Sequence, residues 1–324
     1  MTAKEGLRLL VPPLLWGKAH DLKNQFHLRV AARERDVTYE INGFRLLLPA
    51  AHPLPAFQAA HRLYDRFLVS LGECLPDGAA AIDIGANVGD SAAALCAKAS
   101  MRTVFCVDGS STYFKYLEKN ARIIASHGHD IHCLRAVVGP ARTRARIVEA
   151  WSSGQVVVSQ SGEETLTLDA VCRLARERVS RITVVKIDTD GFDMSVIQSG
   201  PAELERHEPL LFFEVWMRSR SELPLFVSTL SLLSRLGYSR FTILDNFGNI
   251  MLETEELSAL AHIAGYVATL NEGISTRTIY HVDVFASTER NRDIHESAVR
   301  LYRKQYGLPP MMAPPCCFAE PSKG

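Results

Sequence analysis

The chain has 324 residues, and its 36 Lys and Arg residues balance its 36 Asp and Glu residues, so the formal net charge is zero. A neutral chain lacks the excess positive charge that attracts nucleic acids or anionic membranes, so we expect no nucleic-acid partner. Hydrophobic residues make up 47% of the sequence, which is enough for a sizeable core and excludes disorder of the whole chain.

The seven cysteines are odd in number and include no Cys-x-x-Cys pair, which favours buried thiols over disulfides or a zinc site. This usage indicates a reducing compartment, and we predict a cytoplasmic protein. The apolar stretch at residues 7–16 is interrupted by Pro12-Pro13 and is shorter than the roughly 20 residues of a membrane span. We therefore expect no membrane span. Cys316-Cys317 is an alternative lipidation site, although no polybasic run accompanies it.

The N-terminal part of the chain predicts a β-hairpin followed by a helix. Asn42-Gly43 lies between two β-prone runs within residues 37–49, which is typical of a two-residue turn with positive φ. Apolar residues at helical spacing then predict one amphipathic helix over 57–75, ending before Pro76-Asp77-Gly78. We assign residues 1–78 to an N-terminal extension.

From residue 79 onward, short apolar strands alternate with helical segments, a pattern that predicts a parallel sheet flanked by helices. We assign residues 79–290 to this α/β domain and residues 291–324 to a C-terminal helix (291–306) and a flexible Pro-rich tail. The Arg- and Ser-rich segment 140–166 is predicted to be an excursion between strands. The expected strands are 80–84, 103–107, 131–138, 182–187, 210–215, 240–245 and 279–286, and the expected helices are 90–99, 112–126, 168–178, 193–199 and 225–236, the last closed by Gly237.

The strongest motif is the run AAIDIGANVGD from Ala80 to Asp90, in which a strand passes through a glycine turn into a helix. Gly85 and Gly89 allow the backbone to approach a ligand closely, and Asn87 lies between them. The next strand ends in Asp108, at about the spacing where a doubly wound fold places an acid on the ribose hydroxyls. These elements predict a nucleoside site.

Asp83 decides which nucleoside is expected. A dinucleotide fingerprint reads Gly-x-Gly-x-x-Gly, whereas this turn lacks the middle glycine and places Asp83 where a pyrophosphate would be repelled. A cofactor with a positively charged amino-acid end is attracted instead, and S-adenosylmethionine is that cofactor. Two alternatives stay open: Asp83 as a helix cap, and Asn87 as a residue that merely tolerates a left-handed turn.

A second cluster of charged residues follows the strand at 182–187. Lys186, Asp188 and Asp190 lie at its carboxyl end, where ligands bind in open α/β sheets, and Glu214 interrupts the next apolar strand. We predict Asp188 as the general base that deprotonates an acceptor hydroxyl, with Asp190 and Glu214 as the next candidates and Lys186 as their charge partner. As alternatives, Asp193 only begins a helix, and Glu214 only pairs with Lys186 or Arg218.

These motifs together resemble the FkbM family of S-adenosylmethionine-dependent methyltransferases. The resemblance rests on the glycine turn, Thr167-Leu-Asp169, Val185-Lys-Ile-Asp-Thr-Asp-Gly and Phe213-Glu-Val, and it covers about residues 38–216. It implies a seven-stranded Rossmann-like methyltransferase fold and O-methylation of a glycan or small-molecule hydroxyl. Two positions depart from the family pattern: Val-Asp-Gly ends the second strand in place of Val-Glu-Pro, and Asp190 stands where the family usually has Glu.

Several alternatives to this function stay open. A divalent metal among Asp188, Asp190 and Glu214 would assist the transfer by lowering the pKa of the hydroxyl, although we predict no metal ligand set. A non-catalytic binding protein that retains the fold is the other alternative. The histidines at 127, 129 and 132 resemble a metal cluster but are expected on a solvated loop, and His281 is either a strand residue or part of the acceptor site. We expect the acceptor site to include residues 140–166, 246–278 and the N-terminal extension.

Overall fold

The computed structural model describes residues 36–309 except 51, 99, 150–153 and 274–277. The apolar stretch at 7–16, most of the predicted tail and Cys316-Cys317 therefore lie outside the described residues. Within the described part of the chain, no helix has both the length and the apolar character needed to span a membrane.

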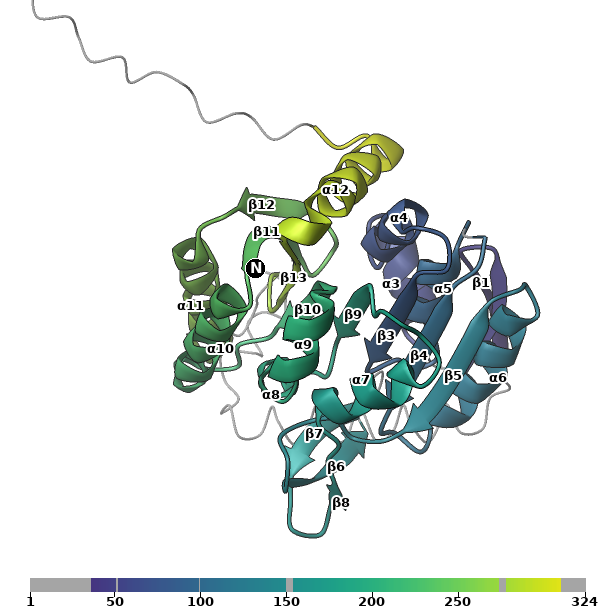
Figure 1. Cartoon of the computed structure of the whole chain (residues 1–324), viewed down its shortest axis with the longest axis horizontal. Helices are drawn as coiled ribbons and strands as arrows, with labels where there is room; N and C mark the ends of the chain where they lie inside the picture. The colour runs from purple at the N-terminus through teal and green to yellow at the C-terminus, as the bar shows by residue number, and fades with distance from the viewer. Residues whose placement is uncertain (1–35, 51, 99, 150–153, 274–277, 310–324) are drawn as a thin grey trace, which may run out of the picture.

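An eight-stranded mixed sheet forms the centre of the molecule, in the order β12-β11-β13-β10-β9-β3-β4-β5 (Figure 1). The five strands from β10 to β5 run parallel, whereas β13 is antiparallel to both of its neighbours. All seven predicted strands are present, which confirms the Rossmann-like fold, and β12 is an additional antiparallel edge strand. The bounds are β3 (Ala80–Ile84), β4 (Thr103–Asp108), β5 (Asp130–Arg135), β9 (Val184–Ile187), β10 (Leu210–Val215), β11 (Tyr238–Asp245), β12 (Ile250–Thr254) and β13 (Val282–Thr288).

The chain leaves β3 toward β4 and β5 on one side, and later returns to β9 on the other side of β3. The strand order therefore switches between β3 and β9, and the loops that leave these two strands diverge at their carboxyl ends. Ligands bind at such switch points in open α/β sheets. The glycine turn and the cluster after β9 accordingly lie next to each other.

Helices cover both faces of the sheet because the strands present buried apolar residues on both sides. One face packs against α4 (Phe67–Cys74), α5 (Asp90–Cys96), α6 (Phe114–Ala125) and α12 (Arg292–Tyr306). The other face packs against α7 (Leu168–Arg176), α8 (Asp193–Gln198), α9 (Pro201–His207), α10 (Leu223–Arg235) and α11 (Leu257–Gly273). Tyr302 of the C-terminal helix α12 stacks edge-on against Phe67 of α4, so elements from both ends of the chain share one core. The domain boundaries at 78/79 and 290/291 remain predictions.

The predicted hairpin is present as β1 (Val37–Ile41) and β2 (Phe44–Leu48), with positive φ at both turn residues, Asn42 and Gly43. The single helix predicted over 57–75 is wrong. It is divided into α3 (Leu54–Ala60) and α4, because the chain turns between them and Asp65 adopts a left-handed conformation (φ +56°). Helices α9 and α11 were not predicted. Gly237 follows α10 with φ +84° and closes it as expected.

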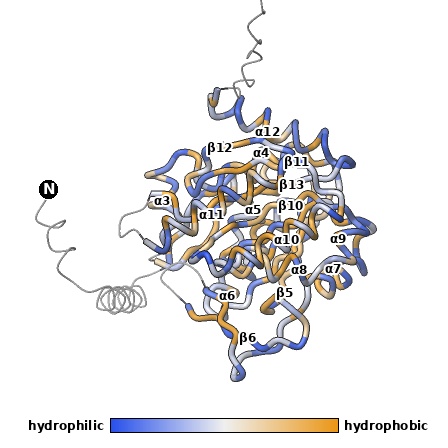
Figure 2. Tube along the Cα trace, turned by 90° about the vertical axis from the view of Figure 1, so that its left-hand side faces the viewer, coloured by the Kyte–Doolittle hydropathy of each residue, from blue (hydrophilic) through white to orange (hydrophobic). Residues whose placement is uncertain are grey.

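The excursion at 140–166 forms a small separate sheet in the order β7-β6-β8, which lies below the main sheet in Figure 1. Its strands are β6 (Arg144–Glu149), β7 (Gly154–Val158) and β8 (Glu163–Glu164), and two short 3₁₀ turns at Arg220–Glu222 and Glu289–Asn291 complete the structure. A tube coloured by hydropathy shows apolar residues concentrated in the main body, with polar residues on its outer helices (Figure 2).

Candidate active site

A cavity of about 320 Å³ opens at the carboxyl ends of the parallel strands, at the switch point between β3 and β9. Its wall combines residues that follow β3, β4, β9 and β10 with residues of α3, β6 and β7. This volume lies within the range of about 300–1,000 Å³ typical of small-molecule sites. The cavity therefore lies where the sequence predicted a nucleoside site.

The glycine turn after β3 is tight and packs directly against the end of β9. Gly85 has φ +76°, and a Cβ atom at this position would collide with the backbone oxygen of Asp188. The backbone N–H groups of Gly85 and Ala86 both donate to the oxygen of Val107, at 2.8 and 3.1 Å. Glycine is required here on two grounds, the left-handed conformation and the close approach of β9.

Asn87 adopts the left-handed conformation that the sequence offered as an alternative, and its role toward a cofactor remains a prediction. It has a left-handed conformation with φ +46°, and it also lines the cavity. Its Oδ1 lies 3.3 Å from Nε2 of His52, whose pKa burial lowers to about 4. His52 is therefore neutral at pH 7 and contributes no charge to this wall.

Asp108 lies at the end of β4 and accepts two backbone hydrogen bonds. Asn87 N donates to Oδ2 at 2.8 Å and Ser110 N donates to Oδ1 at 2.7 Å. Burial raises the pKa of Asp108 to about 6, although both hydrogen bonds act in the opposite direction. Each carboxylate oxygen keeps a second lone pair for a ligand hydroxyl in the cavity.

Gly109 replaces the proline usual in the family, and the structure supplies a steric reason for a small residue here. A Cβ atom at Gly109 would lie 2.9 Å from Val137 Cγ2 and 3.1 Å from Ile147 Cγ1. Glu149 of the same small sheet accepts hydrogen bonds from Ser110 Oγ at 2.6 Å and Thr112 Oγ1 at 2.8 Å. The sheet β7-β6-β8 is thus held over the end of β4.

Asp83 lies beneath the cavity and does not line it, which corrects the expected direct contact with a cofactor. Asp83 is fully buried, and its register partner in β9 is Lys186. Lys186 Nζ lies 3.1 Å from Asp83 Oδ1, and Ser91 Oγ donates to Oδ2 at 2.5 Å. Any effect of Asp83 on a ligand therefore passes through Lys186 and the turn.

Lys186 connects the two halves of the site. Its Nζ donates to Gly85 O at 3.0 Å and lies 3.4 Å from Asp188 Oδ2. Burial alone would lower its pKa, but Asp83, Asp188 and Asp90 together outweigh burial and raise it. Lys186 thus remains charged and holds the end of β9 against the glycine turn.

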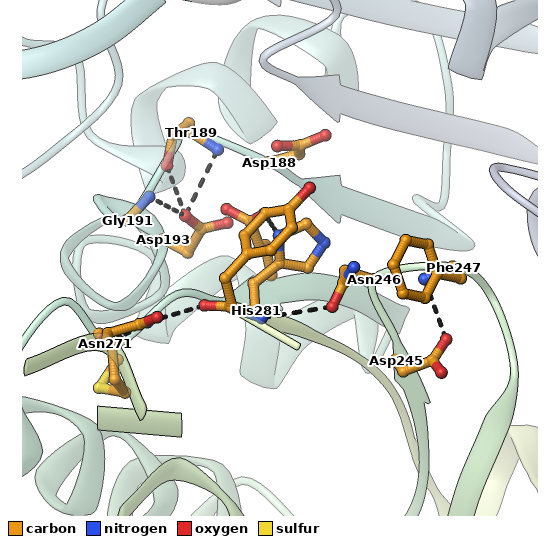
Figure 3. A network of polar contacts seen from close by, with 12 residues as sticks. Asp188, Thr189, Gly191, Asp193, Asp245, Asn246, Phe247, Asn271 and His281 are labelled. Atoms are coloured by element: carbon orange, nitrogen blue, oxygen red, sulfur yellow. Dashed lines mark hydrogen bonds and ion pairs between the residues drawn. The ribbon is translucent and has the colours of Figure 1, made fainter. Parts of the chain in front are cut away.

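The turn after β9 places Asp188 and Asp190 on the cavity wall. The Asp188 side chain is 52% exposed, and Asp190 adopts a left-handed conformation with φ +52°. Asp193 Oδ2 accepts from Thr189 Oγ1 at 3.0 Å and from the amides of Thr189 and Gly191 at 3.3 Å (Figure 3). Asp193 begins α8 and stabilises this turn, as the structural alternative predicted.

Glu214 does not pair with Lys186 or Arg218, contrary to both expectations. Arg218 binds Glu222, while Glu214 Oε1 lies 2.9 Å from Nδ1 of His281, just before β13. Glu214 is 7% exposed, and its Oε2 has no hydrogen-bond partner among the described residues. Burial, reinforced by Asp188 and Asp190, raises the pKa of Glu214 well above its ordinary value.

Seven carboxylates line the described wall of the cavity and outnumber its lysine and arginine side chains, which are those of Lys186 and Arg66. Sequence reasoning gave no role to Asp90, whose pKa burial raises to about 6, and missed Asp65 because the 57–75 pattern suggested an unbroken helix. The carboxylates that line the cavity belong to Asp65, Asp90, Asp108, Asp188, Asp190, Glu214 and Asp283.

The described residues include no group of three or more His, Cys, Asp or Glu side chains arranged to hold a metal ion. Asp188, Asp190 and Glu214 share the cavity wall without forming such a group. The histidines at 127, 129 and 132 are likewise separate: His127 Nδ1 contacts Ile123 O at 2.9 Å, and His132 Nε2 contacts Asp130 at 2.9 Å.

Residues 83–240 match the sequence profile of the family described as Methyltransferase FkbM domain. The protein therefore carries an FkbM methyltransferase domain. This match agrees with the resemblance to the FkbM family that the motifs predicted. The matched segment contains the glycine turn, Asp108, Lys186, Asp188 and Glu214 but not His281. A search of curated proteins gave no significant match.

Solved structures with similarity to the FkbM domain protein include other methyltransferases. A methyltransferase FkbM from Methylobacillus flagellatus KT shares 16% identity, with 62% of this chain and 58% of that chain covered and a TM-score of 0.41. A precorrin-6y C5,15-methyltransferase from Geobacter metallireducens GS-15 shares 10% identity, with coverage of 68% and 88% and a TM-score of 0.35. The plantazolicin methyltransferase BamL, in complex with a triazolic desmethylPZN analog and SAH, shares 10% identity, with coverage of 72% and 89% and a TM-score of 0.38.

Proposed function

We propose that this protein transfers a methyl group from S-adenosylmethionine to a hydroxyl oxygen of a glycan or small-molecule acceptor. The observation that carries this proposal is the cavity at the β3/β9 switch point, whose wall is rich in carboxylates and includes Asp108 at the end of β4. The sulfonium and ammonium groups of S-adenosylmethionine give it the positive charges that such a wall attracts.

The residues present fit this cofactor at both of its ends. Asp108 would accept hydrogen bonds from the ribose hydroxyls, because its carboxylate is already oriented by the Asn87 and Ser110 amides. Val137, Ile147 and Val156 line the cavity near this end and supply apolar surface for a base. Gly85, Asn87 and Gly89 shape the turn, and Asp90 and Asp188 line the cavity as partners for the cationic end.

When bound, S-adenosylmethionine supplies an electrophilic methyl carbon, and the chain must position an acceptor in line with it. Positioning of this kind contributes about 7–11 kcal/mol to barrier reduction in well-oriented systems. Glu214, Trp216, Tyr280 and His281 line the part of the cavity that remains for the acceptor. Lys186 keeps the turn that carries Asp188 and Asp190 fixed against the cofactor end.

The position of Asp188 changes its predicted role. Its carboxylate is half exposed and its charge is already compensated by Lys186 at 3.4 Å. We therefore propose that Asp188 and Asp190 bind and orient the reactants. The general base is then a group beside Glu214 and not Asp188. The metal-assisted alternative finds no ligand group among the described residues.

Isothermal titration with S-adenosylhomocysteine tests the cofactor site directly. We expect Asp108→Ala to weaken binding by about 1–3 kcal/mol, the value of charge-assisted hydrogen bonds, while the exposed control Asp130→Ala binds normally. Formation of S-adenosylhomocysteine with a panel of hydroxylated glycans, lipids and polyketides then tests turnover. Absence of cofactor binding by the wild-type protein would refute the proposal. Binding without turnover on any acceptor would favour a non-catalytic protein.

A further inference from the structure

We infer that His281 is the general base that removes the acceptor proton, and that Glu214 is the residue that positions its ring for this step. This inference rests on the proposed methyl transfer and goes beyond it, since His281 lies outside the segment that matches the FkbM domain. It is carried by an imidazole–carboxylate pair on the cavity wall.

The pair is largely shielded from solvent and lines the cavity. His281 Nδ1 lies 2.9 Å from Glu214 Oε1, the two side chains are 13% and 8% exposed, and both residues line the cavity. The distance between His281 Nδ1 and Glu214 Oε1 is that of a hydrogen bond, but the angles at these atoms do not meet hydrogen-bond geometry. Hydrogen bonds between catalytic residues are commonly poorly aligned without substrate and improve when it binds. Nε2, on the other side of the ring, has no hydrogen-bond partner among the described residues.

The backbone next to His281 is held by the side-chain amides of Asn246 and Asn271. Asn246, which is 2% exposed, accepts from Tyr280 N at 3.3 Å and donates to Thr278 O at 3.2 Å. Asn271 Nδ2 donates to Tyr280 O at 2.8 Å and to Met217 O at 2.7 Å (Figure 3). A side chain held in this way loses little entropy when it is brought to a reacting group.

The chemistry balances with these two residues and the cofactor. The acceptor O–H bond breaks and its proton moves to His281 Nε2, while an oxygen lone pair forms the new bond to the methyl carbon. The electrons of the broken carbon–sulfur bond return to sulfur and give S-adenosylhomocysteine. Glu214 accepts the Nδ1–H bond, which keeps Nε2 unprotonated before the step and stabilises the imidazolium afterwards.

Acidic side chains surround His281 in the cavity wall. Glu214, Asp283 and Tyr280 lie beside it on β10, β13 and the segment before β13, and Asp65, Asp188 and Asp190 line the same cavity. Lys186, which lines the same cavity, is already bound by Asp83 and Asp188. The acidic wall therefore stabilises the imidazolium that a proton transfer produces.

Nitrogen NMR of protein with ¹⁵N-labelled histidine, in complex with S-adenosylhomocysteine, tests the inference without an acceptor. The His281 resonances are assigned by their loss in His281→Gln. We expect the ring proton on Nδ1 in the wild-type protein at pH 8, and a changed distribution of this proton between the two ring nitrogens in Glu214→Gln. A proton on Nε2, or a ring unaffected by Glu214→Gln, would overturn the inference while leaving cofactor binding, and thus the proposed function, intact.

A second experiment measures turnover with an acceptor identified in the panel of hydroxylated compounds, and it tests the role of His281 as the base. We expect His281→Ala to lower kcat by about 10²–10⁴-fold with nearly unchanged affinity for S-adenosylhomocysteine, and added imidazole to restore part of kcat. His132→Gln is the matched control, because His132 forms a 2.9 Å carboxylate contact outside the cavity. Full activity of His281→Ala would show that another group is the base.

Discussion

Replacement of Lys186 by Met tests whether a buried ion pair holds the two halves of the site together. Lys186 Nζ contacts Asp83 Oδ1 at 3.1 Å, Gly85 O at 3.0 Å and Asp188 Oδ2 at 3.4 Å. Asp188 is half exposed and can be solvated by water, but Asp83 is fully buried. The variant therefore leaves one uncompensated buried carboxylate, and breaking such a pair costs about 3–5 kcal/mol.

Urea unfolding followed by circular dichroism measures this cost as a loss in the free energy of unfolding. Lys98→Met is the matched control, because Lys98 pairs with Glu73 at 2.8 Å while remaining 66% exposed, and exposed pairs contribute about 0–1 kcal/mol. The double variant Asp83→Asn/Lys186→Met removes both charges, and we expect it to be more stable than Lys186→Met alone. Equal losses at Lys98 and Lys186, or additive losses in the double variant, would refute the reasoning.

Three further predictions concern the cavity wall. Because the pKa of Asp108 is raised to about 6 and its ionised form is the better ribose acceptor, affinity for S-adenosylhomocysteine should rise from about pH 5 to 7 in calorimetry. The same titration of Asp108→Asn should show no such rise, and a flat wild-type profile would contradict the assignment. Gly85→Ala should lower the Tm more than Gly128→Ala, because both have positive φ but only Gly85 is packed against backbone; equal shifts would exclude the steric cause. Asn246→Ala should speed hydrogen exchange at the Tyr280 amide and leave cofactor affinity unchanged, and unaltered exchange would show that the tether is unimportant.

Much of the architecture was predictable because short apolar strands and glycine turns are local signals. Gly85 directly follows β3, and Asp108 is the last residue of β4. Because these strands are parallel, their carboxyl ends lie at the same edge of the sheet. The direction of a side chain was not predictable in the same way. Asp83 points toward α5 and Lys186, and this depends on the register between β3 and β9, which the spacing along one strand does not reveal.

The partners of isolated polar residues were also beyond the sequence. Glu214 on β10 contacts His281, which directly precedes the neighbouring antiparallel strand β13. The two residues are far apart along the chain, so no local sequence pattern connects them. Asp65 was hidden in a continuous helical periodicity, since a single left-handed residue interrupts the helix without changing the apolar spacing. Its one local signal is that Asp tolerates a left-handed conformation better than most residues.

The sheet β7-β6-β8 has a consequence for the diversification of this scaffold. Its strands pair only with one another among the described residues, and it joins the body through the Val138–Leu166 bridge, Glu149 and the contact of Ile147 with Gly109. An ion pair of 3.0 Å between Glu163 of β8 and Arg135 of β5 adds to these attachments. We expect exchange of residues 141–163 with the equivalent segment of a related protein, with Ile147 and Glu149 retained, to change acceptor selectivity.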